Sequence, residues 1–172
     1  MVQSVELLLD APLDAAVRDE WTRLLDAGLH SQGRVRSESN RPHVTLFVAH
    51  AVPDELEDAL RTAIAVRRIT LRLGGVVIFG GRYATLARTV VPSIELLELQ
   101  ARVFEVLSDC PGIPAHIRPG EWTPHVTLAR QVPAARVGAA VLAAQTPERQ
   151  LTGSSAGVRR WDGEAKREWL LS

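Results

Sequence analysis

The feature that most constrains the fold is a pentapeptide that occurs twice. Pro-His-Val-Thr-Leu spans residues 42–46 and recurs at residues 124–128 of the 172-residue chain. The chain has only five histidines, so two of them stand in the same local sequence. The order of the predicted elements around the two copies indicates that the match belongs to a longer repeat.

The first half of the chain alternates predicted strands and helices. In chain order, the hydrophobic pattern predicts a strand at 5–9, a helix from Pro12, a strand at 43–48, a helix from Pro53 to about Val66 and a strand at 69–79. Gly74 and Gly75 interrupt the last of these strands and indicate a bulge. A turn at Gly80-Gly81 then predicts a hairpin with a strand at 83–90.

The second half repeats this order. It predicts a helix from Pro92, a strand at 125–131, a helix from Pro133 to about Ala144, a strand at 150–161, a turn at Asp162-Gly163 and a strand at 166–171. Pro12 and Pro92 differ by 80 positions (92 − 12), and the two histidines of the pentapeptides differ by 82 (125 − 43). The chain therefore consists of two β-α-β-α-β-β units, with the strand at 83–90 opening the second unit.

This duplication predicts an α+β fold. We expect one bilobal domain over residues 1–172, with the first repeat at about 1–82 and the second at about 83–172. A pseudo-twofold axis relates the repeats, and a central groove lies between two antiparallel sheets. An exchange of terminal strands between the lobes is left open.

The composition narrows the classes of partner. Formal net charge is zero, so neither duplex DNA nor a membrane surface is favoured as a partner. The chain has a single cysteine, and its N-terminus lacks the basic and long apolar regions of a signal peptide. We therefore expect a cytoplasmic monomer without disulfides. The runs at 53–58 and 159–168 are rich in charge and are interpreted as solvated faces.

The repeated motif has a direct structural meaning on a strand. Residues i and i+2 of a strand share one face, so His43 and Thr45 point one way while Val44 faces the other. The second copy behaves in the same way, with His125 and Thr127 on one face. If the pseudo-twofold brings the two strands together, one cavity receives two imidazoles and two hydroxyls.

That set of side chains suits a phosphodiester. One imidazole can act as base and the other as acid near neutral pH, and threonine hydroxyls can donate hydrogen bonds to an anion. The alternative is that each histidine is an ordinary half-buried strand residue and that the repeat records only a duplication. A zinc site formed by His43, His50 and His125 is a further alternative, but neither motif contains an acidic residue, and we expect no metal and no cofactor.

The two His-Val-Thr-Leu motifs, their spacing and the duplicated α+β order resemble the 2H phosphoesterase superfamily, within it the 2′-5′ RNA ligase and RNA 2′,3′-cyclic phosphodiesterase group. The resemblance covers nearly the whole chain. It implies that His43 and His125 are the catalytic pair, with His125 as base and His43 as acid, and that Thr45 and Thr127 hold the phosphate. By the same resemblance, Arg130 contacts phosphate after the second motif.

The expected activity is metal-independent hydrolysis of 2′,3′-cyclic phosphates on RNA ends or nucleotides to 2′-phosphates. Hydrolysis or reversible ligation of another small phosphodiester, such as a 2′-5′ linkage or ADP-ribose cyclic phosphate, is the alternative reaction. A non-catalytic module that binds RNA ends or nucleotides is the alternative of another class. Arg41 precedes the first motif and is a candidate phosphate contact. Trp122 and Tyr83 are candidates to stack a base, although packing is the favoured role of Tyr83.

Overall fold

The computed structural model describes residues 2–65, 68–145 and 150–172. Its strands and helices, in chain order, are β1 (Gln3–Leu9), α1 (Ala11–Asp26), β2 (His43–Ala49), α2 (Glu57–Ala63), β3 (Thr70–Phe79), β4 (Tyr83–Val90), α3 (Ile94–Leu107), β5 (His125–Pro133), α4 (Val137–Ala144), β6 (Leu151–Asp162) and β7 (Arg167–Leu170). Short 3-10 turns at 54–56 and 134–136 precede α2 and α4. The expected end of the second helix, Val66, lies outside the described residues. The α+β prediction is confirmed.

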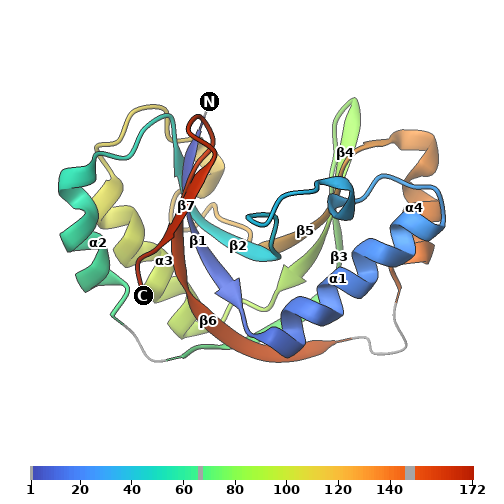
Figure 1. Cartoon of the computed structure of the whole chain (residues 1–172), viewed down its shortest axis with the longest axis horizontal. Coiled ribbons are helices and arrows are strands. Elements are labelled where there is room, and N and C mark those ends of the chain that lie inside the picture. Colours follow the sequence, from blue (N-terminus) through green and yellow to red (C-terminus); the bar gives the residue numbers. More distant parts are fainter. Residues whose placement is uncertain (1, 66–67, 146–149) are drawn as a thin grey trace.

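The strands form one antiparallel sheet in the order β1-β2-β5-β4-β3-β6-β7, with a further pairing of β1 and β6. The beginning of β6 pairs with β3, and the remainder pairs with β1 and β7. At the other side, β2 and β5 meet through one pair, Val44 and Val126. The two halves of the sheet are therefore continuous through β6, which curves beneath both of them in Figure 1.

Each half of the sheet carries two helices, and this defines two lobes. The first lobe comprises β1, β2, β7, the end of β6, and the helices α2 and α3, which contact each other. The second comprises β3, β4, β5, the beginning of β6, and the helices α1 and α4 (Figure 1). The helix α1 belongs to the first repeat but packs beside α4 of the second repeat. In the same way, α3 belongs to the second repeat but packs beside α2 of the first. The two repeats have therefore exchanged their long helices between the lobes.

Local sequence explains where the two long helices begin. The Asp10 side chain accepts a hydrogen bond from the Leu13 backbone at the start of α1, and Ser93 accepts one from Leu96 at the start of α3. The apolar stripes of both helices are buried.

The expected bulge at Gly74-Gly75 is confirmed by a register shift between β3 and β4. Within the described residues, no helix has both the length and the apolarity needed to cross a membrane.

The interpretation of residues 159–168 as a solvated face is wrong at its beginning. Arg159 is 3% exposed and Arg160 is 1% exposed, because β6 lies between β1 and β7 and is covered on both faces. The Arg160 guanidinium donates to the Val52 carbonyl at 2.7 Å and stacks on Trp169 at 4.7 Å. Such contacts offset part of the free-energy cost of removing the arginine charge from water.

Candidate active site

The two motifs lie side by side where β2 meets β5. Val44 and Val126 form the pair that joins the strands, and both valines are fully buried. Paired residues of neighbouring strands point to the same face, and their neighbours in sequence point to the opposite face. That opposite face therefore carries all four motif side chains, each of them half-buried: His43, Thr45, His125 and Thr127.

Each motif histidine is anchored to the backbone two residues before it. Nδ1 of His43 lies 2.7 Å from the carbonyl oxygen of Arg41, and Nδ1 of His125 lies 2.8 Å from that of Thr123. A carbonyl can only accept, so Nδ1 is the nitrogen that carries the proton in both rings. When either imidazole is neutral, its Nε2 is the unprotonated nitrogen and can accept a proton.

Two tryptophans hold the motif strands through their indole nitrogens. The indole N–H of Trp122 donates to the Thr45 carbonyl at 3.1 Å, and that of Trp21 on α1 donates to the Thr127 carbonyl at 3.0 Å. Trp122 is half-buried, with its polar edge committed to β2. Tyr83, for which packing was favoured, is 52% exposed because it stands at the end of the β3–β4 hairpin, against Arg82.

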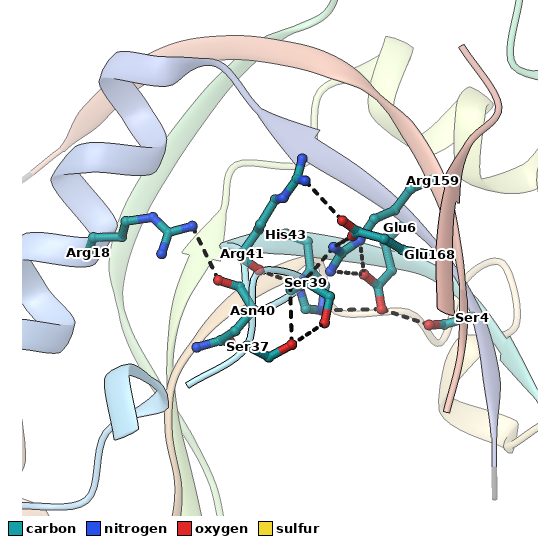
Figure 2. Close-up of polar contacts among 10 residues, drawn as sticks. All are labelled: Ser4, Glu6, Arg18, Ser37, Ser39, Asn40, Arg41, His43, Arg159 and Glu168. Atoms are coloured by element: carbon teal, nitrogen blue, oxygen red, sulfur yellow. Dashed lines mark hydrogen bonds and ion pairs between the residues drawn. The ribbon is translucent and has the colours of Figure 1, made fainter. Parts of the chain in front are cut away.

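His43 has a buried carboxylate beside it. Oε1 of Glu6 lies 3.5 Å from Nε2 of His43, and the Glu6 side chain is 6% exposed (Figure 2). Burial by itself raises the pKa of the Glu6 carboxyl, but the positive charges of His43 and Arg159 and hydrogen bonds from Ser4 and Arg159 outweigh it and hold that pKa below its usual value. Glu6 is therefore an anion next to the first histidine.

Arg41 lies at this side of the site but already has an anionic partner. Its guanidinium lies 2.9 Å from Oε1 of Glu168 on β7, and its side chain is 41% exposed. Glu168 also contacts Arg159, so Figure 2 shows alternating charges from Arg41 through Glu168 and Arg159 to Glu6. Arg41 can meet a bound anion only in competition with Glu168.

His125 has a different environment. The ring of Phe79 packs against its imidazole with 4.7 Å between the centroids. Burial lowers the pKa of His125, and the charges of Arg130, His43 and His116 lower it further, although the hydrogen bond to the Thr123 carbonyl acts in the opposite sense. The pKa of His125 consequently lies below the ordinary imidazole value, and this ring is neutral at neutral pH.

Arg130 follows the second motif where β5 is irregular. The pairing of β5 with β4 shifts register around Leu86, and Gln131 has a φ of 56°. The Arg130 side chain is exposed, and its charge acts on His125. Among the described residues, Arg130 has no acidic partner within ion-pair distance, unlike Arg41. Its guanidinium is accordingly available to an anion in the site.

Sequence reasoning missed Glu6, Arg159 and Phe79. The one available signal for Glu6 was a carboxylate inside the apolar run Val5–Leu9, and its partner Arg159 stood in a run interpreted as solvated. In the part of the chain that the structure describes, no group of three or more His, Cys, Asp or Glu side chains is placed to hold a metal ion.

The chain matches a family model described as the 2′-5′ RNA ligase superfamily over residues 12–165. No curated protein matches the chain.

Solved structures share the fold across almost the whole chain. Usb1 from Kluyveromyces marxianus with uridine monophosphate has a TM-score of 0.58 and 14% identity, covering 99% of this chain and 97% of that one. LigT from E. coli with 3′-AMP has a TM-score of 0.56 and 16% identity, covering 98% and 91%. TT0787 from Thermus thermophilus has a TM-score of 0.56 and 20% identity, covering 100% and 96%.

Proposed function

The chain belongs to the 2′-5′ RNA ligase superfamily of 2H phosphoesterases, and from that premise we propose that it hydrolyses 2′,3′-cyclic phosphates on RNA ends or nucleotides to 2′-phosphates. One observation carries the proposal. Two imidazoles, each with Nδ1 bound to a backbone carbonyl, lie with two threonine side chains on one face where β2 meets β5. Acid and base are the two groups that opening a cyclic phosphate requires.

The proposed reaction uses the two Nε2 atoms in opposite senses. Neutral His125 takes a proton from water through Nε2 while the water oxygen forms a bond to phosphorus. The bond from phosphorus to the 3′-oxygen breaks, and protonated His43 gives its Nε2 proton to that oxygen. The product is a 2′-phosphate with a free 3′-hydroxyl, and a proton transfer from His125 to His43 through solvent restores the starting state.

The remaining motif side chains suit the phosphate oxygens. The hydroxyls of Thr45 and Thr127 are donors that add no charge, so they can bind the two non-bridging oxygens as negative charge builds up there. Arg130 supplies a positive charge near His125. Arg41 and Trp122 are proposed as substrate contacts at the rim, with Arg41 the weaker phosphate contact because Glu168 already binds it.

Nucleotides are the favoured substrate class. Usb1 was solved with uridine monophosphate and LigT with 3′-AMP, and both share the fold of this chain. These similarities support a nucleotide as the ligand, and the proposal adds that it carries a cyclic phosphate, alone or at an RNA end. Zero formal net charge favours recognition of such an end over recognition of a long duplex.

The proposal is tested by incubating the purified full chain with 2′,3′-cyclic AMP and with a short RNA ending in a cyclic phosphate. Phosphorus NMR distinguishes a 2′-phosphate from a 3′-phosphate product. We expect 2′-phosphate from both substrates, and none from a His43→Ala/His125→Ala double variant that still folds. Tight binding of both ligands without turnover would identify a binding module instead.

A further inference from the structure

Three consecutive backbone carbonyls before the first motif are each bound by a different side chain. The carbonyls of residues 39, 40 and 41 accept in turn from Arg159 of β6 at 2.8 Å, from Arg18 of α1 at 3.2 Å and from Nδ1 of His43 at 2.7 Å (Figure 2). The last of these carbonyls orients the first motif histidine. Its position therefore depends on how firmly the segment 39–41 is held by the two arginines.

The segment before the second motif is anchored in another way. There the Thr123 carbonyl binds Nδ1 of His125, and the residues on either side of Thr123 are held by the sheet. The Pro124 carbonyl accepts from the backbone N–H of Val90 on β4 at 2.9 Å, and the Trp122 indole donates to a carbonyl of β2 at 3.1 Å. Sheet contacts thus fix the carbonyl of the second histidine, whereas arginine side chains fix that of the first.

Arg159 is itself fixed by two carboxylates. Its Nε and Nη2 lie 2.8 and 2.7 Å from Oε2 of Glu6 on β1, and its Nη1 contacts both Glu168 on β7 and the Ser39 carbonyl. The Arg159 side chain is 4% exposed. A buried guanidinium that turned away would leave a buried carboxylate without its partner, so its donors are held in one orientation.

The other charged contacts of the segment 39–41 are more exposed. Arg18 has a 44% exposed side chain and also pairs with Asp14 one turn away on α1. Arg41 has a 41% exposed side chain and pairs with Glu168. Ion pairs in contact with water contribute little, because solvent screens them and two long side chains must be ordered. Arg159 is therefore the firmest anchor of the segment.

We infer that Arg159 is a positioning residue for His43. Its guanidinium holds the Ser39 carbonyl and thereby fixes, two residues later, the Arg41 carbonyl that binds Nδ1 of the ring. Arg159 acts through the backbone and takes no part in proton transfer. Its effect on turnover rests on the proposed function, but its effect on the orientation of the ring does not.

Ring tautomers test the inference without substrate. At alkaline pH, where imidazoles are neutral, ¹⁵N NMR of the full chain shows which ring nitrogen carries the proton, and His43→Gln and His125→Gln variants assign the two motif rings. In the wild-type chain both rings should be protonated at Nδ1. Arg159→Lys keeps the charge but loses the planar donor fork, so one ammonium cannot bind Glu6 and the Ser39 carbonyl in the same geometry. His43 should then show a mixture with the Nε2–H form, while His125 in the same sample stays unchanged.

Arg160→Lys is the matched control. Arg160 is the next residue of β6, is 1% exposed and donates to the Val52 carbonyl on the opposite face of the sheet. The same substitution there should also destabilise the fold but leave the His43 tautomer in place. An unchanged His43 ring in folded Arg159→Lys, or an equal change in Arg160→Lys, would overturn the inference. If Arg159→Lys does not fold, Glu168→Gln removes one of the anions that fix the guanidinium, and an unchanged His43 ring in that variant would refute it.

Kinetics separate this inference from the proposed function. With a cyclic nucleotide, Arg159→Lys should lower kcat roughly tenfold to a hundredfold and leave KM nearly unchanged, because a misdirected ring slows proton transfer without weakening binding. Arg160→Lys should retain kcat. A rise in KM at constant kcat in Arg159→Lys would mean that Arg159 binds substrate instead. If the wild-type chain does not turn over cyclic phosphates but the His43 tautomer responds as expected, the proposed function fails and the positioning role of Arg159 stands.

Discussion

The two lobes present the same backbone frame around each motif and different side chains. In both, a carbonyl two residues earlier binds Nδ1 of the histidine, and an indole N–H binds the threonine carbonyl. The first lobe then adds the Glu6 anion, whereas the second adds the Phe79 ring and the nearby charge of Arg130. Duplication can therefore supply two equivalent positions, and the neighbouring strands make them chemically different.

The largest expected effect comes from removing either imidazole. His43→Ala and His125→Ala should each lower kcat by about 10²–10⁴, because each removes a general acid or base. His30→Ala, outside both motifs, is the control and should retain activity. Steady-state kinetics on a cyclic nucleotide measures the loss. Full activity in either motif variant would exclude a mechanism that needs both rings.

A change of leaving group sharpens the same comparison. A nitrophenyl phosphodiester has a leaving group that needs no proton, so the loss in His43→Ala should shrink with this substrate far more than the loss in His125→Ala. The ratio of the two losses on nitrophenyl and cyclic substrates is the measurement. The opposite pattern would exchange the roles of the lobes.

The threonines should matter less than the histidines. Thr45→Val and Thr127→Val keep the shape and remove one donor to a charged group, worth about 1.5–3 kcal/mol, which corresponds to a loss of roughly tenfold to a hundredfold. The shape of the pH–rate profile should not change. Thr62→Val on the surface of α2 is the matched control. Wild-type kinetics in both motif variants would place these hydroxyls away from the phosphate.

The two arginines should differ because only one of them is already paired. Arg130→Lys keeps the charge but loses the planar donor fork, and KM should rise about threefold to tenfold. Arg41→Lys should have a smaller effect, because its guanidinium already binds Glu168. Equal effects on KM would mean that substrate displaces Glu168 from Arg41.

The lowered pKa of His125 should appear in the acid limb of the pH–rate profile and in stability. Because burial and nearby positive charge disfavour its protonated form, the acid limb should lie below the ordinary pKa of imidazole. The folded chain binds this proton less readily than the unfolded chain, so the contribution to stability is present above the unfolded pKa and is lost as pH falls. Replacing Phe79 with Ala should move the acid limb to higher pH. An acid limb that did not move would assign that limb to another group.

The smallest expected effect is that of a chelator. The two histidines supply both proton transfers in the proposed reaction, so excess EDTA should leave the rate on a cyclic nucleotide unchanged. Inactivation by EDTA that Zn²⁺ or Mn²⁺ reverses would contradict the two-histidine mechanism.

The sequence could predict which motif side chains share a face, because the alternation of side chains along a strand can be read from neighbouring residues. His43 and Thr45 share a face for that reason alone, and the repeat placed the second pair at an equivalent position. The environment of each histidine depended on distant residues. Glu6 and Arg159 are 153 positions apart, and the indole of Trp21 reaches a carbonyl 106 positions away. A single carboxylate in an apolar strand creates no periodic pattern, so the sequence does not show that Glu6 pairs with Arg159.

The two lobes share one continuous strand, β6. Its beginning belongs to the lobe of His125 and its end to the lobe of His43, while β2 and β5 share the backbone pair Val44 and Val126. The two lobes, and with them the two motif histidines, are therefore joined both by this continuous strand and by the Val44–Val126 pair. A substitution that changes the twist of β6 would move one lobe relative to the other, and so could reposition the two histidines without altering either motif.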